Sequence, residues 1–564
     1  MIRSRVRVTK DTPLARRGMT AAEHSRGARV GAEILEAGGN AVDAAVATAF
    51  AMTVVEPFMS TLAGSGTMLV HLARRRETLC IDFNGVAPLR AHDGMYRIIG
   101  GVSTALFPWA RVEDEANVFG HRSVAVPGSV AGLTLALERY GTMTLADVMR
   151  PAIELAREGF EPDWYLALSH AKFIEELMAF PETARVYLRN GHAVYRPPSM
   201  QPGDHVRYPD LADSLALIAR DGASAFYRGP IARALCDDMA AHGGIITRED
   251  LSAYEPQVSP ALMGRYRGLE LAFSPGATGG VTALEALNIL EQFAASRVGW
   301  DSAEGLHLRA SAIGRAFTDR FEHLGDPAFV KAPWGELVSK AYARDVAAQI
   351  RGGARRDPAV SRRASRRGPS PDCTTHVSVI DRQRNMVALT HTAVSMWGSR
   401  VVVPGTGILL NNGMIWFDPE TGKNNSVAPG KRALVNMVPA LAFLKGRPHL
   451  ALGAPGGRTI ISAIPQVIAN LADRPRMSAQ AAIDAPRLHT EGGEVLVSHR
   501  ADPAAVAGLA RRGHTVVVKE ETYSTLNFAR PVAVRVTPKG LEAGAESYSA
   551  AAAPGVYRRE QGAR

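Results

Sequence analysis

Two β-branched runs around a short polar stretch are the strongest local pattern in the second half of the chain. Residues Thr374–Ile380 and Met386–Thr392 flank the polar stretch Asp381–Asn385. This pattern predicts a β-hairpin with a five-residue loop. Regular pairing about residue 383 places Thr374 opposite Thr392, close enough for their hydroxyls to meet. An ordinary structural hairpin that follows a linker has the same pattern.

Near the N-terminus, apolar residues recur at helical spacing. They predict a helix over 24–36 that ends at Gly38–Gly39, and a second, alanine-rich helix that Asn40 caps and that ends before Pro57. Strand-like runs follow at 67–73 and 78–83. The N-terminal part is therefore predicted to be a sheet covered by helices.

The middle of the chain is predicted to be mainly helical. Residues 127–160 have a helical pattern, within which Pro151 is expected to start a new helix. Residues 169–349 alternate helical segments with glycine turns at 243–244 and 279–280. The glycine-rich segment 274–280 lacks the Lys-Ser/Thr ending of a phosphate loop, so we expect a structural turn before a buried helix and no nucleotide site.

After Arg367 the chain is rich in strands, interrupted by helices predicted at 458–471 and 478–484. The predicted strands are 377–380, 386–389, 401–403, 440–444, 450–452, 516–518 and 533–536. Strands in this part and helices in both parts indicate an α/β (α+β) protein with stacked sheets between helical layers.

Composition and charge exclude some classes of function but do not identify the function. The chain has 564 residues, 46% of them hydrophobic, as is normal for a soluble globular protein. Its net charge of +10 comes largely from arginine clusters within 351–370, a composition typical of a solvated linker. No nucleic-acid-binding motif accompanies that charge, so we expect no nucleic-acid partner.

Cysteine content and hydropathy bear on location and cofactors. Cys80, Cys236 and Cys373 are widely spaced and form no metal or redox motif, which fits a reducing compartment. The apolar stretch 41–55 contains Asp43 and is too short to span a bilayer, and the N-terminus resembles no signal peptide. We therefore expect a cytoplasmic protein with no membrane association, no cofactor and no metal.

The start of the predicted hairpin could carry catalytic chemistry. If the Cys373–Thr374 bond were cut, Thr374 would hold both a nucleophilic hydroxyl and an α-amine, whose unperturbed pKa is about 7.7–8.0. Thr392 would orient the Thr374 hydroxyl from the adjacent strand. Strand alternation points Thr375 away from this site, and the α-amine makes His376 unnecessary as a base.

A second segment could stabilise an oxyanion. Residues 450–459 run from a strand through glycines into a helix, so the N–H groups of Gly456 and Gly457 would lie at a helix N-terminus. In isolation, an ordinary glycine-rich strand-to-helix turn is the more common explanation of such a segment.

Several motifs, in order, resemble the γ-glutamyltranspeptidase family of N-terminal-nucleophile hydrolases over nearly the whole chain. They are Ala37-Gly-Gly-Asn-Ala-Val-Asp-Ala-Ala45, Val126-Pro-Gly-Ser-Val-Ala-Gly132, the hairpin start Thr374-Thr-His-Val-Ser-Val379, Gly407-Ile-Leu-Leu-Asn-Asn-Gly-Met414, Ala428-Pro-Gly-Lys-Arg432 and Gly453-Ala-Pro-Gly-Gly457.

The resemblance implies a four-layer αββα sandwich and a proenzyme that cuts itself before Thr374. The products would be a large subunit, 1–373, and a small catalytic subunit, 374–564, in a heterodimer or a dimer of such heterodimers. It further implies that Thr374 is the nucleophile, that Thr392 assists it and that Gly456 and Gly457 form the oxyanion hole. The substrate would be a small amide or γ-glutamyl-like molecule.

The residues with which the family binds glutamate are largely replaced here. By the resemblance, the substrate-binding positions are Asn84 in place of an arginine, Val394 in place of an asparagine, Asn412, Trp416 in place of an acidic residue, and Val435 and Asn436 in place of two serines. Loss of charge partners favours an acylase or amidohydrolase for an apolar or uncharged acyl group, as in the family's cephalosporin acylases.

Two alternatives remain. In the first, the chain is a genuine γ-glutamyltransferase or glutathione hydrolase that binds glutamate through other residues, such as Arg400 or Arg458. In the second, it is a non-processing pseudoenzyme with a binding role; the retained Thr374 and Thr392 argue against this.

Overall fold

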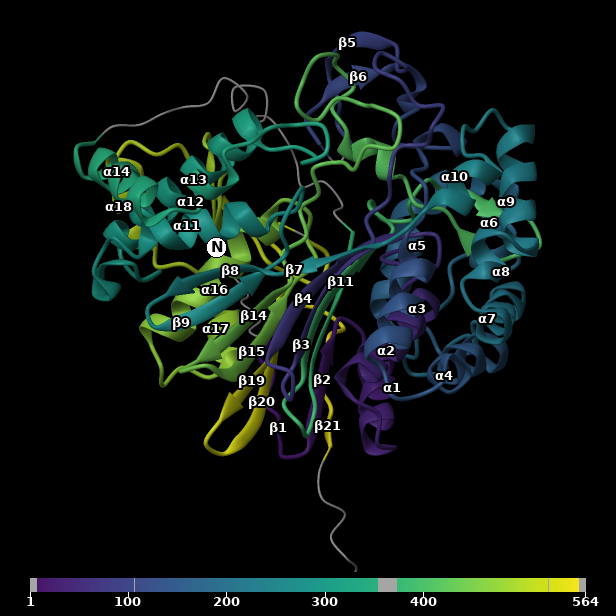
Figure 1. The fold of residues 1–564 in the computed structure, drawn as a ribbon, viewed down its shortest axis with the longest axis horizontal. Coiled ribbons are helices and arrows are strands. Elements are labelled where there is room, and N and C mark those ends of the chain that lie inside the picture. Colours follow the sequence, from purple (N-terminus) through teal and green to yellow (C-terminus); the bar gives the residue numbers. More distant parts are fainter. Residues whose placement is uncertain (1–7, 106, 354–372, 526, 557–564) are drawn as a thin grey trace, which may run out of the picture.

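Two stacked antiparallel sheets form the centre of the molecule (Figure 1). The computed structural model describes residues 8–105, 107–353, 373–525 and 527–556. One sheet, here the β10–β11 sheet, has the order β21-β2-β10-β11-β3-β4-β7. Its strands are β2 (Gly18–Ala22), β3 (Ser65–Leu72), β4 (Glu77–Asp82), β7 (Gln257–Pro260), β10 (Thr375–Ile380), β11 (Met386–Thr392) and β21 (Gly555–Val556).

The second sheet, the β14–β15 sheet, has the order β1-β20-β19-β15-β14-β9-β8. Its strands are β1 (Leu14–Ala15), β8 (Leu262–Tyr266), β9 (Leu269–Phe273), β14 (Ala440–Leu444), β15 (Arg447–Gly453), β19 (Val532–Thr537) and β20 (Gly540–Ala545). Smaller sheets pair β5 (Ile98–Val102) with β6 (Ala110–Val112), β12 (Val402–Val403) with β13 (Ile408–Leu409), and β16 (Leu488–His489) with β17 (Val495–Ser498) and β18 (Val516–Lys519).

Helices cover the outer face of each large sheet, which confirms the αββα sandwich (Figure 1). On the β10–β11 side lie α1 (Ser25–Glu36), α2 (Ala41–Val55), α3 (Ser129–Tyr140), α4 (Leu145–Glu158), α5 (Trp164–Met178), α6 (Pro181–Tyr187), α7 (Pro209–Asp221), α8 (Ser224–Tyr227), α9 (Pro230–Ala241) and α10 (Arg248–Ala253). On the other side lie α11 (Gly280–Leu290), α12 (Ala303–His323), α13 (Trp334–Leu337), α14 (Lys340–Arg351), α16 (Thr459–Asp473), α17 (Ala479–Asp484) and α18 (Pro503–Arg511).

Alternation along the central strands separates the apolar layers. Val377 and Val379 of β10 pack towards α2, whereas Ile380 packs between the two sheets. Helix α2 is buried along its whole length, and its many alanines let it lie close against β10 and β11. Asn40 caps α2 in a capping box with Asp43, as the sequence predicts for Asn40. The hairpin start is thereby held between a helix and a second sheet.

Both large sheets combine strands from each side of the 373–374 bond. In the β10–β11 sheet, β2 and β3 come from the N-terminal side of that bond and flank β10 and β11 from its C-terminal side. In the β14–β15 sheet, β9 pairs with β14 in the same manner. Cleavage between Cys373 and Thr374 would therefore leave two fragments joined by backbone ladders.

Some element predictions are wrong. Pro151 lies inside α4 and does not start a helix; the break falls at Gly141, and Thr144 caps α4 by accepting from Asp147 N–H. Strands β7, β8 and β9 lie in the middle region that the sequence pattern predicts as helices and turns. Most of the predicted arginine-rich linker, 354–372, lies outside the described residues. No helix among the described residues is both long and apolar enough to cross a membrane.

Candidate active site

The β10–β11 hairpin has the predicted register. Thr375 pairs with His391 and Ile380 with Met386, so Thr374 and Thr392 come next to one another at the open end. Their Oγ1 atoms are 3.3 Å apart, and both residues are buried. The two threonines share the face of the strand that points to the β14–β15 sheet, because alternate residues of a strand point to one face.

The Thr374 hydroxyl lies against the carbonyl that precedes it. It donates a hydrogen bond to the Cys373 carbonyl oxygen, and Thr392 Oγ1 donates to the same oxygen at 3.0 Å. Cys373 itself is fixed by its Sγ, which donates to the Phe58 and Met59 carbonyls at 2.9 and 2.8 Å. A nucleophile beside the carbonyl carbon and a donor on its oxygen are what attack on the 373–374 bond requires.

A strained residue fixes Thr392. Val394 N–H donates to Thr392 Oγ1 at 2.8 Å, which leaves the Thr392 proton free for Cys373. Val394 holds a φ of 89°, a left-handed conformation that β-branched residues rarely adopt and that costs of order 1–3 kcal/mol. Such strain persists only where the surrounding structure over-determines it.

We expect Thr392→Ala to slow both processing and turnover by roughly ten- to a hundredfold without unfolding the protein. The variant loses the hydroxyl donor to the Cys373 carbonyl and the contact to Thr374 Oγ1, and one such hydrogen bond is worth about 1–3 kcal/mol. The rate of fragment appearance on denaturing gels measures the effect, with Thr392→Ser as the matched control. Wild-type rates in Thr392→Ala would contradict this role.

His376 is buried behind the threonines and is a structural residue in this arrangement. Its Nδ1 lies 2.9 Å from Thr390 Oγ1 and its Nε2 lies 3.1 Å from Ser378 Oγ. Burial lowers the pKa of His376 to about 3, so the ring is neutral near pH 7. The ring packs on Gly453, where an added Cβ would lie only 2.1 Å from it.

Gly453→Ala should therefore disturb the contact between the two sheets directly behind Thr374. We expect a loss of stability of at least about 1–3 kcal/mol, because neither the His376 ring nor the strand can move freely in a packed core. Thermal unfolding of the purified variant measures it. Gly335→Ala is the control, since nothing lies within 4 Å of its added Cβ; equal melting temperatures would show that the contact is not tight.

The strand β15 leads from Gly453 into the turn that carries Gly456 and Gly457. Because Gly453 lies on His376, the turn is placed at the same end of the stacked sheets as Thr374. Both glycines hold positive φ values, 134° and 52°, and α16 begins two residues later. Among the described residues neither N–H has a hydrogen-bond partner, so both are available to an anion at this helix N-terminus.

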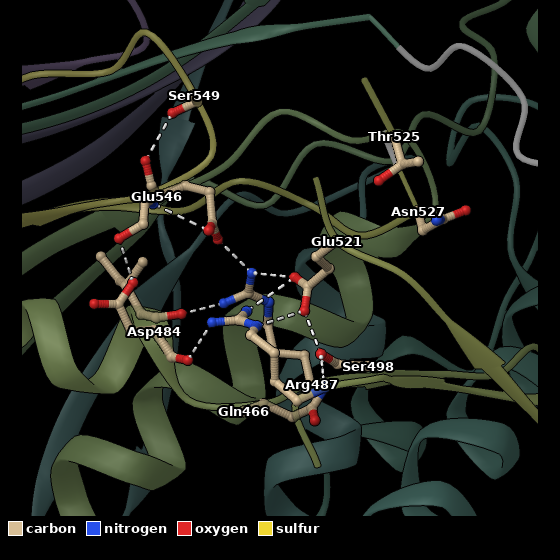
Figure 2. Close-up of polar contacts among 12 residues, drawn as sticks. Gln466, Asp484, Arg487, Ser498, Glu521, Thr525, Asn527, Glu546 and Ser549 are labelled. Atoms are coloured by element: carbon tan, nitrogen blue, oxygen red, sulfur yellow. Dashed lines mark hydrogen bonds and ion pairs between the residues drawn. The ribbon is translucent and has the colours of Figure 1, made fainter. Parts of the chain in front are cut away.

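A buried ionic network fixes the segment behind this turn (Figure 2). Arg487 pairs with both Glu521 and Glu546, and Ser498 donates to Glu521. Glu521 begins the segment that leads to Ala529 and Arg530; Arg530 N–H donates to the Pro455 carbonyl at 3.0 Å. An added Cβ on Gly456 would lie 2.6 Å from Ala529 Cα, so this segment is the wall against which the turn is set.

On the helical side of the hairpin lie buried titratable groups that the sequence interpretation missed. Glu23 and Glu56 are buried, and desolvation raises the pKa of each to about 8. Thr375 Oγ1 donates to Glu56 at 3.5 Å, on the face opposite Thr374. The Arg530 guanidinium lies 4.7 Å from the Tyr165 ring centre. The sequence signal that could have revealed Glu23 and Glu56 is an acidic residue next to an apolar run.

Three of the five replaced family positions meet in one apolar cluster. Val394, Trp416 and Val435 pack together with Phe107 and Met414. Val394 joins this cluster to the nucleophile, since its N–H binds Thr392. The structure thus brings together the positions at which the sequence predicts an uncharged acyl site.

Two polar members of the predicted substrate set, Asn84 and Asn412, are held by hydrogen bonds within the protein, and Asn412 donates to Val118, a member of this cluster. Asn84 donates to Thr67 Oγ1 at 3.0 Å and to Asp82 at 2.8 Å, and its Oδ1 is buried without a partner among the described residues. The Asn412 side-chain amide accepts a hydrogen bond from Ser395 N–H and donates to Ser395 Oγ and to the Val118 carbonyl. Contact of either residue with substrate stays a prediction.

A cleft of about 460 Å³ opens beside the turn and the apolar cluster. Its wall includes Trp109, Phe321, Asn436 and two arginines, Arg320 and Arg458. Arg458 pairs with Glu491 at 2.9 Å and stacks on Trp109, whose indole N–H donates to the Ile415 carbonyl. The cleft therefore adjoins the apolar cluster through Trp109.

Arg320 was not among the predicted residues. It is buried in α12, donates to the Thr278 and Val435 carbonyls and to Asn436 Oδ1, and takes part in no ion pair among the described residues. Burial, and then the nearby Arg458, lower its pKa to about 9. The sequence signal that could have revealed Arg320 is a charged residue on the otherwise apolar face of a helix. By contrast, Arg400 is already paired with Glu176.

Two sheets between helical layers, with a buried threonine at the start of a central strand, define an N-terminal-nucleophile hydrolase. The Gamma-glutamyltranspeptidase family profile matches residues 27–556, and the chain belongs to the γ-glutamyltranspeptidase family.

Relatives and a solved structure extend over nearly the whole chain. An acylase ACY 1 proenzyme of Pseudomonas sp. (strain SE83) is 40% identical, over 95% of this chain and 93% of its own. A glutathione hydrolase proenzyme of Escherichia coli (strain K12) is 35% identical, over 91% and 88%. The crystal structure of a cephalosporin acylase from Bacillus halodurans superimposes with a TM-score of 0.85 at 27% identity, over 98% of both chains.

Proposed function

We propose that this protein is a self-processing acylase that hydrolyses, or transfers, an amide-linked acyl group through Thr374. The observation that carries the proposal is the Thr374 hydroxyl, hydrogen-bonded to the Cys373 carbonyl with Thr392 donating to the same oxygen. Family membership and the acylase and glutathione hydrolase relatives support a hydrolase or transferase that acts on amides.

Processing begins when Thr374 Oγ1 attacks the Cys373 carbonyl carbon. The C–N bond breaks as the ester forms, the Thr374 nitrogen gains the hydroxyl proton, and water then hydrolyses the ester. This releases a Cys373 carboxylate and the free Thr374 amine. The interleaved sheets would hold the 1–373 and 374–564 fragments together as a heterodimer.

In turnover, the Thr374 amine accepts the hydroxyl proton while Oγ1 attacks the substrate carbonyl. The oxyanion is stabilised by the free N–H groups of Gly456 and Gly457 at the start of α16. The proton passes to the leaving amine, and water or an acceptor amine resolves the acyl-threonine.

The acyl group is proposed to be uncharged or singly charged. The apolar cluster of Val394, Trp416 and Val435 adjoins Thr392 and contains no acidic side chain that could pair with the α-ammonium of a zwitterion. The 460 Å³ cleft, with its mixed charges, would take the polar remainder of the substrate.

A γ-glutamyl enzyme is the second candidate, favoured by one observation. Arg320 lines the cleft and has no ion-pair partner among the described residues, so it could take the α-carboxylate of glutamate. The E. coli relative, named a glutathione hydrolase, keeps this candidate open. A cytoplasmic location and a dimer of heterodimers stay predictions, and a non-processing binding protein is the remaining alternative.

Trapping of the acyl-enzyme tests the proposal. A slowly hydrolysed aryl ester of a short uncharged acid should add one acyl mass to the 374–564 fragment, and peptide mapping should place it on Thr374. Acylation of any other residue at the catalytic rate, or full amidase activity in unprocessed protein, would overturn the mechanism.

A further inference from the structure

A group of side chains able to bind a metal lies where α9 meets the 3₁₀ turn His121–Ser123. His121 begins that turn, Asp238 lies in the last turn of α9, and His242 follows the end of the helix. One ligand atom from each of the three side chains lies within 4.8 Å of the others.

The two histidine side chains converge on the Asp238 carboxylate. His121 Nε2 lies 2.9 Å from Asp238 Oδ2, and His242 Nδ1 lies 3.0 Å from Asp238 Oδ1. Asp238 and His242 are one helical turn apart and so share a face of α9. The imidazole rings stack with centroids 4.6 Å apart and planes at 17°, and His242 Nδ1 also lies 3.0 Å from the Asp238 carbonyl oxygen.

These distances are close to those of a metal site. Tetrahedral coordination with bonds of about 2.0–2.1 Å separates neighbouring ligand atoms by roughly 3.3 Å. The observed N···O distances of 2.9 and 3.0 Å are shorter than this, so both rings would move outward on binding, and the three ligand atoms already lie within 4.8 Å of one another. Asp238 is almost completely buried, whereas the His242 side chain is 57% exposed, so one side of the group is open to water.

We propose that His121, Asp238 and His242 bind a divalent transition-metal ion of the Zn²⁺ type, with water in the open position. Two imidazoles and one carboxylate suit zinc and its neighbours and disfavour Mg²⁺ and Ca²⁺, which prefer oxygen ligands. The ion would replace the imidazole protons that now face Asp238.

The bound ion would have a structural role next to the candidate active site. The segment before His121 is docked on the 374–564 part of the chain, since Gly120 N–H donates to the Ser399 carbonyl and Val118 accepts from Asn412 Nδ2. Binding would tie this segment to α9. It would stabilise the protein by mass action and leave the chemistry at Thr374 to the residues described above.

Titration of untagged, chelator-stripped full-length protein with Zn²⁺ tests the proposal. We expect one site of micromolar or tighter affinity, a rise in melting temperature with zinc, and a loss of affinity of about tenfold or more in His121→Ala and in His242→Ala. His192→Ala is the control, because its ring lies on the surface and bonds to the Asn190 carbonyl. Because His242 is exposed, its variant stays informative even if His121→Ala folds poorly.

Two results would overturn the proposal. Millimolar affinity in the wild type would show that the group is only a hydrogen-bonded His–Asp–His arrangement. Unchanged binding in both histidine variants would place the ion elsewhere, for example at Asp319, Glu322 and His323.

Discussion

Thr374→Ala is expected to yield a single uncut chain of 564 residues with amidase activity reduced at least about a thousandfold. The substitution removes the hydroxyl that lies against the Cys373 carbonyl, and with it the nucleophile of both processing and turnover. Wild-type protein should instead give fragments of 373 and 191 residues, the second beginning at Thr374. Intact-mass spectrometry and an amide hydrolysis assay measure both effects.

The neighbouring threonine gives a matched control. Thr375 is equally buried but points to the opposite face of β10, towards Glu56, so Thr375→Ala should still be cut. Thr374→Ser should also be cut, since it keeps the hydroxyl. Processing in Thr374→Ala at the wild-type rate would remove the basis of the mechanism.

The second large effect concerns acyl specificity. We expect the double variant Asn84→Arg/Trp416→Asp to raise kcat/KM for a γ-glutamyl anilide by more than the product of the two single variants, by roughly tenfold. Each missing charge partner for the substrate's α-carboxylate and α-ammonium costs about 1–3 kcal/mol on desolvation. In Asn84→Arg alone, the ammonium would still meet the apolar cluster around Trp416.

Folding of these variants has to be followed in parallel, since Trp416 is buried and Asn84 lies beside Asp82. Trp416→Phe, which keeps the site apolar, is the control and should leave γ-glutamyl turnover unchanged. A folded double variant whose gain equals the product of the singles would show that residues 84 and 416 do not bind one substrate together.

The hairpin and the helices next to it were predictable because their causes are local. Strand alternation and the centre of the 381–385 loop fixed the Thr374–Thr392 pairing, which the structure confirms. Asn40 and the alanine-rich run predicted α2 for the same reason. Pro151 misled the prediction because a proline signals a helix start only when no better cap is near, and Thr144 supplies one.

What the sequence could not supply is the long-range assembly of the site. Arg320 of α12 donates to the carbonyl of Val435, which is more than a hundred residues away in the sequence. Arg487 pairs with Glu521 and Glu546 and through them fixes the segment that packs behind the Gly456 turn. Strands β8 and β9 pair with each other across the short turn at Arg267 and Gly268, a local hairpin signal that the interpretation missed, and β9 also pairs with β14, which lies far along the chain. Such contacts depend on pairing between distant segments, which local periodicity does not encode.

The most direct test of the account is the wild-type preference between two anilides that differ only in the α-amino group. The account predicts a higher kcat/KM for the glutaryl anilide than for the γ-glutamyl anilide, by roughly tenfold or more, because the ammonium has no partner in the cluster of Val394, Trp416 and Val435. A clear preference for the γ-glutamyl compound would contradict it and would show that this enzyme binds glutamate through other residues, with Arg320 the first to examine.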